Sequence, residues 1–179
     1  AHPIHSPDFF TENPMALNAP TLTSTSTPGL LQRGLDAWAL LTQALNDLQP
    51  LVALAARVYV AQVFFLAGLT KLRDWDTTLL LFTEEYKVPL LSPAVAAVMG
   101  TAGEIVLPIL LLLGLGGRFA ALGLSLVNAM AVLALAEIAP AAFQQHILWG
   151  ALLAGIAIYG PGPWSLERWV WPRLRGAAA

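Results

Sequence analysis

The chain has no cysteine at any of its 179 positions. It therefore cannot form disulfides, thiolate metal sites or cysteine-held iron–sulfur clusters from its own residues, and it has no thiols that could relay electrons. A membrane oxidoreductase that passes electrons between a quinone and a disulfide is excluded on the same ground.

Charged residues are also scarce. They make up 11% of the chain, against 57% hydrophobic residues and a mean hydropathy of +0.67. A soluble domain has about 25% charged residues, so this chain has too few charges to cover a water-soluble globule of its size. The composition predicts a membrane protein in contact with lipid. The formal net charge of -2 gives no basic excess, and we expect no nucleic-acid partner.

The first 48 residues divide into two parts. Residues 1–29 are rich in Pro, Thr, Ser and Asn without an apolar period, which predicts a disordered or extended arm. Residues 30–48 repeat Leu and Trp at spacings of three and four, which is typical of a helix with one apolar stripe. This segment is too polar to span a membrane, and we expect an amphipathic helix in the headgroup plane.

Four long apolar segments follow, at about residues 51–72, 93–116, 118–138 and 144–160. Each is close to the roughly 20 residues that cross a hydrocarbon core about 30 Å thick. Gln49-Pro50 and Ser92-Pro93 each suit a helix cap followed by a first-turn proline. In the link between the first two segments, Asp76 suits the cap of a short helix that turns Leu79, Leu80 and Phe82 inward. The predicted fold is all-α: a polytopic four-helix membrane bundle over residues 51–170, with the interfacial helix before it and a short tail at 171–179.

Lysine and arginine near the segment ends predict the orientation. The side that holds both termini has five arginines, whereas the lysines and arginine of the opposite side are diluted by acids. Both termini are therefore expected in the cytoplasm, with the protein in the inner (plasma) membrane of a bacterium. The five arginines are Arg33, Arg118, Arg168, Arg173 and Arg175.

Five polar residues fall within or near the predicted spans. Glu104 lies about 16 Å into the second span, near the bilayer midplane, and Asn128 lies at a similar depth in the third. Arg57 lies roughly 10 Å inside the first span, and Glu104 is its natural partner. His146 lies in the outer part of the fourth span, and Lys71 at the outer end of the first, where it can extend to the headgroups.

A charge at the bilayer centre is unfavourable by about 2.5–3.5 kcal/mol, so such residues face protein and usually have a function. Gly100, Glu104 and Pro108 share one helix face, where small residues allow a helix or a flat ligand to approach. Two interpretations remain open for the acid: a pairing that only fixes helix register, or a ligand or proton site. For His146 and Lys71 the structural interpretation is the stronger one.

Several chemistries are excluded by the residues present. A di-iron site needs several Glu and Glu-x-x-His motifs, and a spanning haem needs paired axial ligands, whereas His146 has no second His in the bundle. No nucleotide-binding glycine motif occurs. We therefore expect no metal and no redox cofactor of its own. The chain could bind a quinone, or support a subunit that carries the cofactor.

Six short motifs succeed one another over residues 51–170: an early Arg in the first span, "GLTKL" at its end, "VP" before the second span, "GE" inside it, "GGR" after it and a closing "GPG" followed by "SL". In this order they resemble the DoxX/DoxD family of small bacterial membrane proteins. The resemblance implies four transmembrane helices and a subunit of a thiosulfate:quinone oxidoreductase or terminal-oxidase assembly that works beside a second subunit. It also implies recurrent polar residues at Arg57, Lys71, Glu104 and Arg118. The N-terminal extension and the polar "FQQHILW" depart from the family pattern.

Two hypotheses follow. In the first, the chain is a quinone-linked oxidoreductase subunit with Glu104 and Arg57 paired near the quinone, and with Asn128, His146 or Lys71 supplying hydrogen bonds or protons. In the second, it is a non-catalytic accessory subunit that stabilises or assembles a larger membrane complex. Both require a partner protein.

Overall fold

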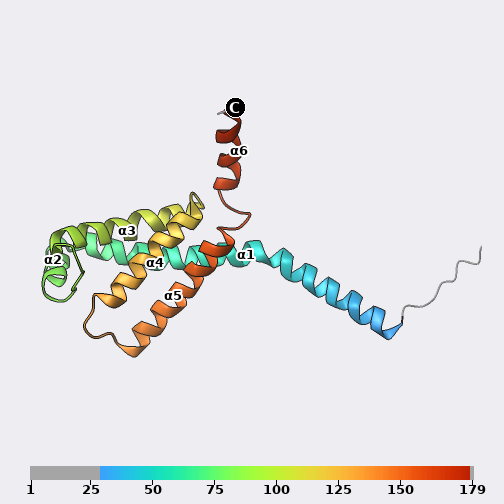
Figure 1. Ribbon diagram of the computed structural model, residues 1–179, viewed down its shortest axis with the longest axis horizontal. Helices are drawn as coiled ribbons and strands as arrows, with labels where there is room; N and C mark the ends of the chain where they lie inside the picture. The colour runs from blue at the N-terminus through green and yellow to red at the C-terminus, as the bar shows by residue number, and fades with distance from the viewer. Residues whose placement is uncertain (1–28, 178–179) are drawn as a thin grey trace, which may run out of the picture. The chain divides into compact units, whose positions relative to one another are not determined.

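The computed structural model describes residues 29–177, and these residues form helices without any strand (Figure 1). The predicted N-terminal arm lies almost wholly outside this range. The all-α prediction is confirmed. The helices are α1 (Leu30–Arg73), α2 (Trp75–Glu84), α3 (Pro93–Leu113), α4 (Gly117–Leu133), α5 (Pro140–Tyr159) and α6 (Glu167–Ala177).

The chain divides into two compact units, Ala1–Ala39 and Leu40–Ala179. The described part of the first unit is the beginning of α1, where Gln32 Nε2 donates a hydrogen bond to Asp36 Oδ1 at 3.2 Å. Its apolar stripe includes Leu31, Leu35 and Trp38, and all three side chains are exposed. An amphipathic helix that binds a surface would present its apolar side chains in this way. The interfacial location of this helix stays a prediction.

The predicted helix start at Pro50 is wrong, because α1 continues without a break through this proline for 44 residues. A proline inside a helix removes one backbone hydrogen bond, here the bond to the carbonyl of Asn46. Asn46 is exposed, so its carbonyl can be solvated, and its side chain accepts a bond from Gln49 Nε2 at 2.9 Å. The Gln49-Pro50 motif therefore does not mark a boundary between the exposed segment of residues 30–48 and the apolar segment that follows it.

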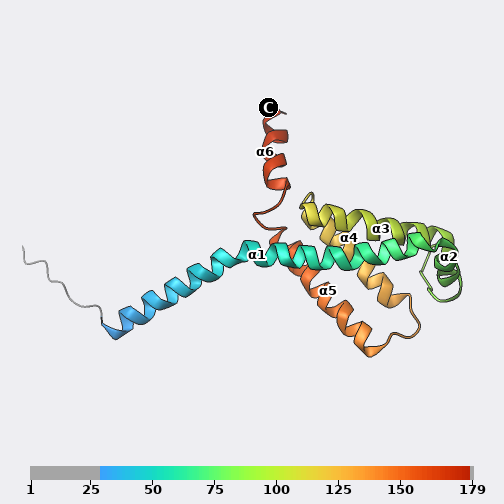
Figure 2. The ribbon, with the colours of Figure 1, turned by 180° about the vertical axis from the view of Figure 1, so that it is seen from behind.

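The core of the second unit joins α1, α3, α4 and α5, which Figure 2 shows side by side. Its buried side chains include Val60 and Phe64 of α1, Leu111 of α3, Leu124 of α4 and Leu153 of α5. Gly114 and Gly116 adopt left-handed φ values of 67° and 57° in the tight turn between α3 and α4. This turn makes α3 and α4 an antiparallel pair, as predicted.

Among the described residues, α1, α3 and α5 are long and apolar enough to cross a membrane. With 17 residues, α4 is apolar but about 25 Å long, which is shorter than a typical span. The predicted third span ran to residue 138, but the helix ends at Leu133 and Pro140 begins the next one. A bundle of four membrane-crossing helices therefore remains a prediction, while the membrane character of the chain is clear.

Helix α2 begins at Trp75, and its cap is Asp74 rather than the predicted Asp76. The Asp74 carboxylate accepts hydrogen bonds from the backbone N–H and the hydroxyl of Thr77, at 3.0 and 2.7 Å. These bonds lower the pKa of Asp74, the hydroxyl having the larger effect. Phe82 is buried as predicted, whereas Leu80 is exposed. Thr78 takes the inward position because its hydroxyl bonds the carbonyls of Lys71 and Asp74.

Candidate functional site

Glu104 forms an ion pair with Lys71, whose Nζ lies 2.5 Å from Glu104 Oε2. Lys71 comes from the last turn of α1, and Glu104 lies at the middle of α3. The Glu104 residue is 7% exposed, so its carboxylate faces the protein rather than the acyl chains. The predicted extension of Lys71 to the headgroups is wrong, because its ammonium group turns inward to this acid.

The ion pair depends on a close approach of α1 and α3 at Gly68. A Cβ placed on Gly68 would lie 3.0 Å from Glu104 Cβ and 2.8 Å from Ile105 Cδ1. Ile105 Cδ1 is the end of a flexible side chain and can rotate away, but Glu104 Cβ is fixed to the backbone of α3, so a larger residue at Gly68 would displace α3 by a few tenths of an ångström. Gly68 thus positions Glu104 within reach of Lys71.

Thr101 lies one turn before Glu104 on the buried face of α3. It is 3% exposed, and its hydroxyl is buried without a hydrogen-bond partner in the described part of the chain. A buried hydroxyl without a partner is unfavourable, so this position suits a water or a ligand group. Thr101 was not among the predicted site residues, although its i, i+3 spacing from Glu104 places both on one helix face.

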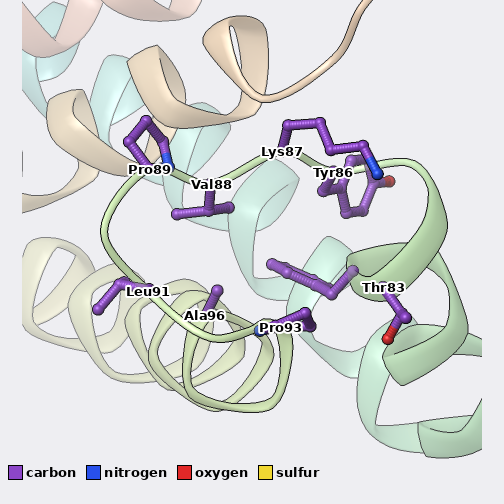
Figure 3. Close-up of a pocket in the computed structure, with 9 residues that line it drawn as sticks. Thr83, Tyr86, Lys87, Val88, Pro89, Leu91, Pro93 and Ala96 are labelled. Carbon is purple, nitrogen blue, oxygen red and sulfur yellow. The ribbon is translucent and has the colours of Figure 1, made fainter.

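A cavity of about 450 Å³ lies under the loop that joins α2 to α3. Figure 3 shows this loop curving over the cavity from Tyr86 to Leu91, with Pro93 and Ala96 of α3 on the other side. Six of the nine lining residues have apolar side chains and three have polar ones, while polar and apolar atoms contribute about equally to the surface of the cavity. The lining residues are Phe82, Thr83, Tyr86, Lys87, Val88, Pro89, Leu91, Pro93 and Ala96.

Tyr86 connects this cavity to the ion pair. Its ring packs edge-on against Phe82, with centroids 4.9 Å apart. Burial raises the pKa of Tyr86, and the charges of Glu85 and Glu104 raise it further. Tyr86 therefore lines the cavity and lies within the electrostatic field of Glu104, and its hydroxyl stays protonated over a wider pH range.

The predicted pair of Arg57 with Glu104 does not form. The Arg57 guanidinium donates instead to four backbone carbonyls: from Nε to Leu111 at 2.9 Å, from Nη1 to Pro161 and Trp164 at 2.9 and 2.7 Å, and from Nη2 to Leu112. Arg57 precedes Lys71 by about four helical turns on α1, so antiparallel packing brings it to the end of α3 rather than to its middle. It lies level with the last carbonyls of α3, not deep in the span as predicted.

These contacts attach the loop after α5 to the turn between α3 and α4. Leu166 N–H donates to Leu113 O at 3.0 Å, and Glu167 N–H donates to Gly114 O at 3.1 Å. The Glu167 carboxylate accepts a bond from Gly117 N–H at 3.1 Å. Arg57 is fully buried within this arrangement and satisfies carbonyls that the end of α3 leaves free. Its contacts make Arg57 a structural residue.

Asn128 and His146 form a third polar group, between α4 and α5. Asn128 Nδ2 donates to the backbone oxygen of His146 at 2.9 Å, and Asn128 Oδ1 lies 2.8 Å from His146 Nδ1. Because a carbonyl oxygen only accepts, the imidazole donates from Nδ1. The next turn of α5 continues the connection, since Trp149 Nε1 donates to Tyr59 OH on α1 at 3.3 Å.

The five predicted site residues thus form three separate groups rather than one polar cluster. Lys71 and Glu104 pair between α1 and α3, Arg57 holds the loop after α5, and Asn128 with His146 joins α4 to α5. Within residues 29–177, no three His, Cys, Asp or Glu side chains are placed to hold a metal ion.

A model of the DoxX family matches residues 52–137. Residues 52–137 therefore form a DoxX domain. The DoxX domain runs from α1 to the loop after α4 and contains Arg57, Lys71, Glu104 and Asn128, whereas His146 follows it. No curated protein and no solved structure matches the chain.

Proposed function

We propose that this DoxX-domain protein is an integral membrane subunit of a respiratory-type, quinone-linked oxidoreductase complex. The observation that supports this function best is the inward-facing Lys71–Glu104 pair, whose acid also acts electrostatically on Tyr86, a residue of the cavity lining. The proposal places the quinone headgroup in that cavity. The protein would lie in a bacterial inner membrane with both termini in the cytoplasm.

The cavity suits such a ligand in size and chemistry. Small-molecule sites typically enclose about 300–1,000 Å³, with mostly apolar walls and a few polar groups that fix orientation. The volume of about 450 Å³ falls in this range, and Phe82, Val88 and Leu91 supply apolar surface. The Tyr86 hydroxyl and the Lys87 ammonium group supply hydrogen-bond donors.

A bound quinone would supply the two-electron, two-proton chemistry. The chain's own residues would handle the protons. The Glu104 carboxylate would hold or release a proton at Oε2, and Lys71 would stabilise its charged form. Tyr86 would donate its O–H to a ring oxygen, and the apolar loop above it would exclude bulk water. A partner protein would deliver or remove the electrons.

The test is to purify the full chain in mild detergent, extract bound quinone and quantify it by chromatography. We expect quinone in the wild type and in the control variant Glu137→Gln, whose side chain is exposed and outside the cavity. We expect its loss in Glu104→Gln and in the charge-free pair Lys71→Gln with Glu104→Gln. An unchanged elution volume would show that the fold is intact. Equal quinone in all four proteins, or none in the wild type, would contradict the proposal.

A second candidate is a non-catalytic accessory subunit that stabilises a larger complex. It is favoured by the exposed leucines in the part of α1 before the bundle, Leu41, Leu45 and Leu48, which could dock on a partner protein. It is also favoured by the packing roles of Arg57, Asn128 and His146. A stable complex with a partner enzyme whose activity is unchanged by Glu104→Gln would support this candidate over the first.

A further inference from the structure

A second, larger cavity lies at the opposite end of the bundle. Its volume is about 780 Å³, and it is formed by the beginning of α4, the loop after α5 and the first turns of α6. The cavity at the Lys71–Glu104 end adjoins the start of α3, whereas this one adjoins the turn that follows α3. The proposed quinone function makes no use of it.

The charge of this cavity is positive. Arg118 and Arg168 line it, and both residues are exposed. Arg118 makes a long bond of 3.3 Å from Nη2 to Ile158 O, which leaves most of its N–H groups available. The carboxylate in the lining, Glu167, accepts the backbone N–H of Gly117. Two guanidinium groups therefore face one carboxylate that already has a partner.

Aromatic side chains surround these arginines. Phe119, Tyr159 and Trp171 line the same cavity, and all three are more than half exposed. Tyrosine and tryptophan are enriched where a membrane protein meets the headgroups. Leu122 and Leu126 are also exposed and follow Phe119 at spacings of three and four, so an apolar row runs along α4 from the cavity.

We infer that this cavity binds the phosphate headgroup of an anionic phospholipid. Arg118 and Arg168 contact the phosphate, since guanidinium groups bind phosphate in a forked geometry. The acyl chains lie along Phe119, Leu122 and Leu126. Free phosphate shares the headgroup chemistry but has no chains to cover this row, and the continuity of charge and apolar surface favours the lipid.

The test uses the full chain in nanodiscs made of phosphatidylcholine alone or with phosphatidylglycerol. After transfer to detergent, native mass spectrometry counts retained phosphatidylglycerol. We expect a retained anionic lipid on the wild type and an affinity reduced roughly fivefold by each of Arg118→Gln and Arg168→Gln. The matched control is Arg73→Gln, an exposed arginine in the last turn of α1 at the other end of the bundle.

Arg168→Gln keeps the test valid if Arg118→Gln unfolds the protein, because the Arg168 side chain is exposed and makes no hydrogen bond or ion pair within residues 29–177. Equal retention of phosphatidylglycerol by the wild type, Arg168→Gln and Arg73→Gln would overturn the inference. Displacement of the lipid by inorganic phosphate alone at millimolar concentration would also overturn it, because the acyl chains would then contribute nothing.

Discussion

The guanidinium of Arg57 is satisfied by four carbonyl oxygens of two chain segments, the end of α3 and the loop after α5, instead of by a carboxylate. Each of these oxygens belongs to a helix end or a loop, where fewer backbone N–H groups are available, although Leu111 O also accepts the N–H of Gly114 at 3.1 Å. One side chain thus serves α1, the end of α3 and the loop after α5 together. This explains how an arginine can be fully buried in a chain with so few acids.

We expect Arg57→Gln to destabilise the protein by at least about 3 kcal/mol, because buried carbonyls would lose charged donors. Arg57→Lys keeps the charge but cannot donate in four directions, and should be intermediate. The measurement is thermal unfolding in detergent. Arg33→Gln, at an exposed position on the same helix, is the control and should match the wild type. Equal stability of Arg57→Gln and Arg33→Gln would refute the structural role.

The sequence identified Glu104 as a buried acid, and its burial confirms that reasoning, whereas its partner was assigned wrongly. Arg57 was paired with Glu104 because both were placed at an estimated depth in the membrane from their positions in the predicted helices, without knowledge of how those helices pack. Lys71 lies near the end of its helix, where extension to the headgroups is usual, and only the packed position of α3 brings its ammonium group inward. Thr101 was missed because an unsatisfied hydroxyl is a property of packing, which single-residue patterns do not show.

At the scale of the element, the approach of α1 to α3 rests on a single missing side chain, at Gly68. We expect Gly68→Ala to separate the helices and weaken the Lys71–Glu104 pair, with a loss of about 1–3 kcal/mol from overpacking. Gly155→Ala is the matched control, because a Cβ there meets no atom within 4 Å. That control should stabilise α5 by about 0.5–1 kcal/mol.

Thermal unfolding of both variants gives the comparison, and quinone retention in Gly68→Ala should fall together with the ion pair. A Gly68→Ala protein at least as stable as Gly155→Ala would show that the close approach is not required.

Helix type was predictable from composition, but helix boundaries were not. Apolar runs identified α3 and α5, and the Ser92-Pro93 start of α3 is confirmed. The similar cap pair at Gln49-Pro50 wrongly predicted a helix start, because an exposed helix tolerates the one hydrogen bond that a proline removes. Pro140 disfavours helix only at Ala139, the residue before it, and does not explain why α4 ends at Leu133.

For the whole molecule, the lack of cysteine allows a direct test of orientation. We expect Arg173→Cys to react with a membrane-impermeant maleimide only after cells are opened, because arginine-rich ends face the cytoplasm. Glu137→Cys, in the exposed loop between α4 and α5, should react in intact cells. The wild type is the unlabelled control. Labelling of both variants from the same side would contradict a membrane-crossing α5, the helix that lies between the two positions.

The contacts of Arg57 also bear on how the protein is made. Two of its acceptors, Pro161 and Trp164, are translated more than 100 residues after the arginine itself. A nascent chain must therefore bring its first helix into the bilayer while the cation still lacks half of its acceptors. Incomplete translation products would keep that exposed charge, which makes them the form that we expect membrane proteases to remove.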